Sequence, residues 1–158
     1  MPKKTFKQKM INIGELRFNC AESTLIGVND LYKLPGFGPS VLRIASNFGG
    51  GVAGFGNICG AISAGMMALA LVYGTDGTEQ KGEFDEKRKK LRSISQSLLS
   101  DFEQEFGSLN CTNLLGVDRR TEEGLKLYAE KKSRGEFLCD RYVDWTVSKV
   151  LDLLSGKS

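Results

Sequence analysis

Apolar residues recur at helical spacing along most of the chain, and only three prolines interrupt the pattern. Between Lys81 and Phe106 they return every three or four residues, which predicts one long amphipathic helix. Gly107 then stands where a glycine commonly ends a helix. No segment has the alternation of a convincing strand. We therefore expect an all-α fold.

Shorter helices are predicted around this long one. The segment 57–73 is the most apolar, and its small residues, at spacings of three and four, would let another backbone approach closely. A glycine-dense loop, Phe48 to Gly56, precedes it. The remaining predicted helices are Lys3–Arg17, 19–32, 39–46, Cys111–Leu115, 121–132 and 136–154. A chain of 158 residues can bury one real core, so we expect a single-domain helical bundle over residues 1–158, with the glycine-rich loop before its central apolar helix.

Charge and hydropathy narrow the class of protein. The net charge of +3 is too small to indicate a nucleic-acid partner. The longest apolar run, Ile58–Tyr73, is slightly short for a membrane span and is interrupted by glycine and serine. The N-terminal residues have neither the apolar stretch of a signal peptide nor a twin-arginine signal. We expect a cytoplasmic protein that binds no nucleic acid and does not span a membrane.

The chain has four cysteines and no histidine. The missing histidine excludes histidine catalysis, histidine metal ligands and Ser-His-Asp chemistry. Thiolates remain as the most specialised chemical resource, either as redox thiols or as ligands of a soft metal centre. Wide separations leave no CxxC pair and no zinc-finger spacing. The four residues are Cys20, Cys59, Cys111 and Cys139.

Each cysteine stands at or near the start of a predicted helix. Cys59 is the strongest candidate, because it follows the glycine loop and lies in the first turn of the apolar helix. The free N–H groups and positive partial charge of a helix N-terminus would lower the pKa of its thiol. Backbone N–H donors at sulfur are also what an iron–sulfur cluster needs. The alternative is that Cys59 is merely a small buried residue on an apolar helix.

The glycine loop also contains a G-x-G-x-x-G pattern, from Gly49 to Gly54. A dinucleotide-binding site requires a strand before this motif, and the residues before it have helical spacing instead. We expect the loop to cover the cysteine site and to offer N–H donors to it, with no bound nucleotide.

Several short segments together resemble a known family. They are Asn19-Cys20-Ala21-Glu22, Phe48-Gly49-Gly50-Gly51, Cys59-Gly60-Ala61, Tyr73-Gly74, Phe106-Gly107-Ser108, Asn110-Cys111, Leu114-Leu115-Gly116 and Cys139. In their order and spacing the sequence resembles the C_GCAxxG_C_C family of small redox-active proteins, over about residues 18–154. The family's core would have glycine at position 64, where this chain has Ala64 followed by Gly65.

The resemblance implies a redox role with a bound iron–sulfur cluster, and a partner among oxidoreductases or transporter-associated redox proteins. The expected cofactor-binding residues are the four cysteines together with Gly50, Gly51 and Gly60. The cysteines would be the metal ligands, within one chain or across a homodimer. Any enzymatic activity, as part of an oxidoreductase, is left open.

Four hypotheses follow for the cysteines. The preferred one is electron transfer through an iron–sulfur cluster, since all-thiolate ligation fits a chain without histidine and excludes a Rieske centre. The second is a thiol–disulfide redox protein or sensor, which would need no cofactor. The third is a structural zinc domain with four thiolates, and the fourth is a helical adaptor with inert cysteines.

Overall fold

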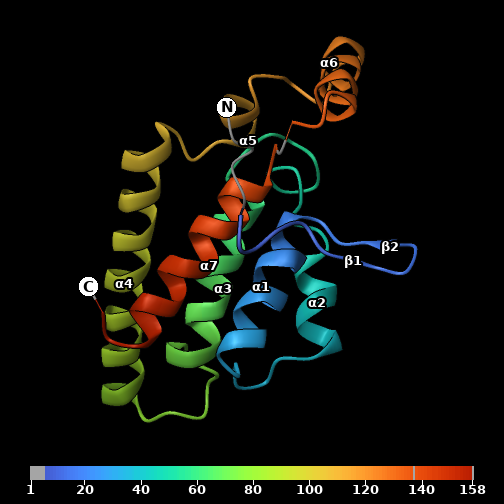
Figure 1. The fold of residues 1–158 in the computed structure, drawn as a ribbon. Helices are drawn as coiled ribbons and strands as arrows, with labels where there is room; N and C mark the ends of the chain where they lie inside the picture. The colour runs from blue at the N-terminus through green and yellow to red at the C-terminus, as the bar shows by residue number, and fades with distance from the viewer. Residues whose placement is uncertain (1–5, 137, 158) are drawn as a thin grey trace.

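The computed structural model describes residues 6–136 and 138–157. Over these residues the chain is mainly helical, which confirms the predicted all-α class (Figure 1). The elements are β1 (Asn12–Ile13), β2 (Leu16–Arg17), α1 (Cys20–Leu31), α2 (Pro39–Ala45), α3 (Gly60–Tyr73), α4 (Lys81–Phe106), α5 (Cys111–Leu115), α6 (Glu122–Ser133) and α7 (Asp140–Leu154).

Helix α3 lies at the centre of the bundle and packs against α1, α4 and α7. Gly65 allows this close packing, because a Cβ atom there would lie 2.7 Å from Thr146 Cγ2 of α7 and 3.2 Å from Leu98 Cδ2 of α4. The close approach expected from the small residues of this segment is thus observed. Figure 1 shows that α1, α3 and α7 all begin at the same end of the bundle, where α5 also lies.

Capping residues and glycines next to the helices account for several of the observed helix ends. Asn19 caps α1 through a reciprocal pair of bonds with Glu22, since each side chain accepts from the other residue's backbone N–H at 3.0 Å. Thr121 Oγ1 accepts from the Gly124 N–H at 2.9 Å and caps α6. Gly107, at φ +81°, ends α4 in the left-handed conformation.

The predicted helix over Lys3–Arg17 is wrong for its described part. Residues 12–17 form a small antiparallel hairpin, β1–β2, that turns at Gly14 (φ +58°). Residues 3–5 of the predicted helix lie outside the described segments. The described residues before the hairpin are not helical, because tertiary acceptors satisfy part of their backbone. The N–H groups of Gln8 and Met10 donate to Asp144 Oδ1 and Asp140 Oδ1 on α7, both at 2.9 Å.

The last helix begins later than expected, at Asp140 instead of Glu136. Gly135, at φ +73°, and a bond from the Leu138 N–H to the Glu136 carbonyl at 3.0 Å form a turn there instead. This turn makes Cys139 the N-cap residue of α7. Among the described helices, none is both long and apolar enough to cross a membrane.

Candidate functional site

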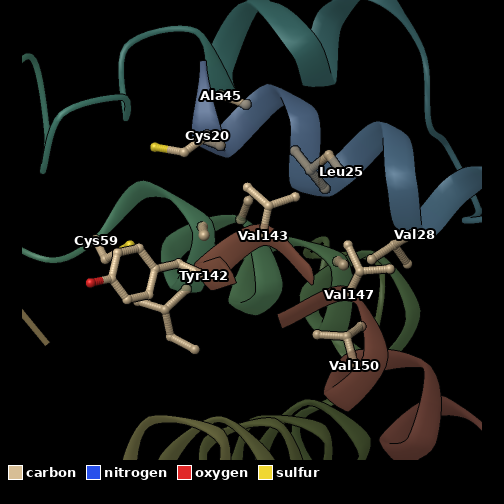
Figure 2. Packing of buried hydrophobic residues seen from close by; sticks show 14 of the residues in the cluster. Cys20, Leu25, Val28, Ala45, Cys59, Tyr142, Val143, Val147 and Val150 are labelled. Carbon is tan, nitrogen blue, oxygen red and sulfur yellow. The ribbon is translucent and has the colours of Figure 1, made fainter. Parts of the chain in front are cut away.

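The four cysteines line one half-open cavity of about 350 Å³ at the end of the bundle where the helices begin. Cys20 and Cys111 are the first residues of α1 and α5, while Cys59 and Cys139 are the N-caps of α3 and α7. Figure 2 shows Cys20 and Cys59 at the same end of the core as Tyr142. The cysteines therefore converge from four separate elements, as the sequence pattern led us to expect.

Two backbone segments hold Cys59 and Cys111 side by side. The Cys59 N–H donates to the Leu109 carbonyl at 2.8 Å, and the Cys111 N–H donates to the Asn57 carbonyl at 2.7 Å. Ile58 and Asn110 form an antiparallel bridge between these bonds. The short paired region fixes the backbone beneath both thiols, although they are far apart in the sequence.

The glycine loop covers the cavity, where Gly49, Gly50 and Gly54 are among the lining residues. Its backbone is left-handed even at Val52 (φ +65°) and Ala53 (φ +51°). Such a conformation costs about 1–2 kcal/mol per non-glycine residue. Bonds within the loop hold this strained shape, including Gly54 N–H to the Gly49 carbonyl at 3.0 Å. Strain of this kind is typical of functional sites.

The loop also acts on a thiol, because the Gly50 backbone lowers the pKa of Cys20 against the larger effect of burial. The predicted role of the loop as a cover over the cysteines agrees with the structure, whereas its N–H groups as donors to a cofactor stay a prediction. The element that precedes it is helix α2, not the strand that a dinucleotide-binding site requires.

The three predicted glycines have different roles. Gly50 lines the cavity, whereas Gly51 and Gly60 lie behind cysteines. A Cβ atom on Gly51 would lie 2.7 Å from Cys111 Cβ, and one on Gly60 would overlap Cys20 Sγ. These two glycines thus leave room for thiol side chains.

Burial dominates the electrostatics of the cysteines. It raises the pKa of Cys59 to about 12 and that of Cys111 to about 11, and the neighbouring Cys20 adds to both shifts. Burial raises the pKa values of Cys20 and Cys139 as well. The N–H groups of Ala61 and Ile62 act in the opposite direction at Cys59 but do not prevail.

The predicted low pKa of Cys59 is therefore wrong for this site without an added cation. Cys59 is only 4% exposed, so the cost of burying a thiolate exceeds the stabilisation from the start of α3. All four thiols are therefore mainly neutral near pH 7 and react slowly as nucleophiles.

Sequence reasoning missed Arg119 and Tyr128, which also line the cavity. The Arg119 guanidinium lies 4.3 Å from the centre of the Tyr128 ring, and it favours the thiolate forms of Cys20, Cys111 and Cys139. Arg119 stands in the connection between α5 and α6, next to a second arginine. No local pattern in the sequence distinguishes the two arginines.

The donors do not form a compact site for one ion. Among the residues that the structure describes, no group of three or more cysteine or carboxylate side chains is arranged to hold a single metal ion. The thiols instead surround an open volume.

The arrangement of the cysteines agrees with a comparison of the chain with protein families. Residues 18–153 match the family model described as "Putative redox-active protein (C_GCAxxG_C_C)". The chain belongs to this family. All four cysteines fall within the match, and the family description names redox activity without a cofactor or partner. No curated protein and no solved structure matches the chain significantly.

In this C_GCAxxG_C_C protein the resemblance led us to expect a glycine at position 64, where the chain has Ala64. Ala64 is fully buried in α3, and the next residue, Gly65, supplies the close contact with α7 and α4. The contact that requires glycine is thus one position further along the helix.

Proposed function

We propose that this protein transfers electrons through an iron–sulfur cluster held by Cys20, Cys59, Cys111 and Cys139. The observation that carries the proposal is the convergence of four thiols, from four different elements, on one half-open cavity. Cysteine thiolates are the usual ligands of such clusters.

The size of the cavity favours a cluster over a single zinc ion. Its volume of about 350 Å³ is far more than one ion needs, since even a water molecule takes about 30 Å³. The described ligands are also not gathered around one point. A group of several atoms suits thiols that surround a volume.

The polar groups around the thiols fit an anionic, thiolate-bound centre. The backbone of Gly50 favours the thiolate form of Cys20, and the backbone of Ala61 and Ile62 favours that of Cys59. Arg119 adds a positive charge whose buried Nε has no hydrogen-bond partner. Without a metal, the thiols stay protonated near pH 7 because their pKa values are raised. A bound metal centre would displace these protons and hold the thiolates. When bound, an iron–sulfur cluster supplies one-electron transfer at a potential tuned by hydrogen bonds to its sulfurs.

The second candidate is thiol–disulfide chemistry with the same residues. It is favoured by the paired backbone segments that hold Cys59 beside Cys111, and both are free thiols. The raised pKa values oppose it, because exchange requires a thiolate.

Iron and sulfide analysis of anaerobically reconstituted protein tests the proposal, with the visible spectrum as a second readout. Cys59→Ser should abolish loading, because a serine oxygen is a poor ligand for soft iron. The helical circular dichroism should persist, with a stability cost of about 1–3 kcal/mol for the buried hydroxyl. Gly82→Ala, at an open position near the start of α4, is a matched control that should load like the parent.

A parent that never holds iron would contradict the cluster hypothesis. Loss of two free thiols per chain on mild oxidation would then favour the dithiol candidate, and bound zinc would favour a structural role. Iron content that is unchanged in Cys59→Ser would exclude this cysteine as a ligand.

A further inference from the structure

We infer that the thiol cavity admits small free anions and that Arg119 is the residue that recognises them. The inference rests on the proposed function only in taking this cavity as the reactive site. It requires no cluster, and it concerns which reagents reach the thiols.

Arg119 is the only residue with a formal charge among the described residues that line the cavity. Its Nε is buried and has no hydrogen-bond partner, and no described carboxylate forms an ion pair with it. The centre of the Tyr128 ring lies 4.3 Å from the guanidinium carbon, and a cation–π contact of this kind does not use the N–H groups as hydrogen-bond donors to an anion. A buried guanidinium N–H without a partner is costly, and its planar fork suits oxyanions and carboxylates.

Asp118, the acidic residue next to Arg119 in the sequence, is already paired with Arg120. Asp118 receives two bonds from Arg120, from Nε to Oδ1 and from Nη2 to Oδ2, both at 3.0 Å. The fold thus pairs the exposed arginine and leaves the cavity arginine unpaired.

Arg119 is also close to the glycine loop that covers the cavity. A Cβ atom built on Gly50 would lie 3.3 Å from Arg119 Nη1, and the Gly50 backbone favours the thiolate form of Cys20. The positive charge of Arg119 also lowers the pKa of Cys111 and of Cys139, against the larger effect of burial. An anion bound to the guanidinium would therefore lie next to the thiols.

A second hollow on the surface provides a positively charged approach. It shares Met10, Tyr128 and Cys139 with the thiol cavity, and Cys139 is the most exposed of the four cysteines. Its cationic residues are Lys9, Arg17 and Lys132.

Both acidic residues in this second hollow, Glu136 and Asp140, already have partners. Glu136 pairs with Arg134 at 3.2 Å and with Lys131 at 3.7 Å, and Asp140 accepts the Met10 N–H at 2.9 Å. The net positive charge of the hollow would attract anions toward Cys139.

Alkylation of the reduced, metal-free protein tests the inference. Iodoacetate is an anion and iodoacetamide is its neutral analogue. With each, a thiolate sulfur forms a bond to the CH₂ carbon, iodide leaves, and the thiol proton passes to buffer. The measured quantity is the ratio of the two rates, divided by the same ratio for the unfolded protein.

We expect this ratio to favour iodoacetate on the order of tenfold in the parent, the lower end of what charge focusing in a cleft achieves. Arg119→Gln should lower it several-fold toward the unfolded value, with a small remainder from Lys9, Arg17 and Lys132, whereas Arg119→Lys should retain more of it. The matched control is Arg120→Gln, which removes an exposed arginine outside the cavity and should leave the ratio unchanged.

An equal ratio of rates in the parent and in folded Arg119→Gln would overturn the inference. It would do so even if a separate reconstitution showed that Arg119→Gln no longer binds iron. In that case Arg119 would act only as a counter-charge for the metal centre. If Arg119→Gln does not fold, the parent ratio decides, because a charge-based preference must fall as sodium chloride is added. A preference that is independent of salt would equally refute it. Since the protein is metal-free, absence of a cluster would not affect the result.

Discussion

Gly60→Ala should destabilise the protein and disturb the cysteine site, although alanine is the better helix former. Gly60 is the first residue of α3, at the crossing with α1. A Cβ atom there would overlap Cys20 Sγ and lie 2.8 Å from the Phe48 carbonyl oxygen. The thiol can rotate away, but the backbone carbonyl cannot, so the helix or the start of the glycine loop must shift.

The expected change in the free energy of unfolding of Gly60→Ala follows from two opposing effects. Overpacking of this kind costs about 1–3 kcal/mol, and the gain in helix propensity is at most about 1 kcal/mol at a helix end. The net loss should be about 1–2 kcal/mol in the free energy of unfolding. Gly82→Ala is the matched control, because Gly82 lies in the first turn of α4 with nothing within 4 Å of its added Cβ. It should gain about 0.5–1 kcal/mol.

Urea denaturation followed by circular dichroism measures both variants against the parent. The order of stability should be Gly82→Ala, then parent, then Gly60→Ala. The reactivity of the Cys20 thiol should also change in Gly60→Ala alone. If Gly60→Ala were as stable as Gly82→Ala, the close packing of α3 on Cys20 and Phe48 would be refuted.

Two further predictions concern alkaline pH and the N-terminal segment. The pKa of Cys59 rises from 9.0 to about 12 on folding, so above pH 9 the unfolded chain releases a proton that the folded protein keeps. Stability should therefore fall as pH rises from 9 toward 12, and Cys59→Ala should reduce that slope by about 1 kcal/mol per pH unit; equal slopes in urea titrations would contradict this. Asp144→Ala removes the acceptor of the Gln8 N–H and should cost about 1–2 kcal/mol, with faster hydrogen exchange at Gln8, whereas Asp144→Asn keeps an acceptor oxygen. Unchanged exchange in Asp144→Ala would show that α7 does not hold this segment.

The sequence by itself determined most of the helices and the position of the cysteines near helix starts. Apolar spacing predicted α4 from Lys81 to Phe106, and it ends at Gly107 as predicted. The starts expected near residues 19 and 121 agree with α1 and α6, where Asn19 and Thr121 are the caps. These signals are carried by neighbouring residues, so they can be recognised without knowing the fold. The same local signals placed each cysteine at a helix start.

Tertiary structure alone decided the remaining features. The start of the segment before α1 is not helical because Asp140 and Asp144, more than a hundred residues away, accept its N–H groups. The thiol pKa values rise because α1, α3 and α7 bury the cysteines together, which outweighs the local effect of a helix start. Arg119 joins the site because the connection after α5 folds over the cavity. Burial and long-range pairing are properties of the packed chain, and no short stretch of sequence encodes them.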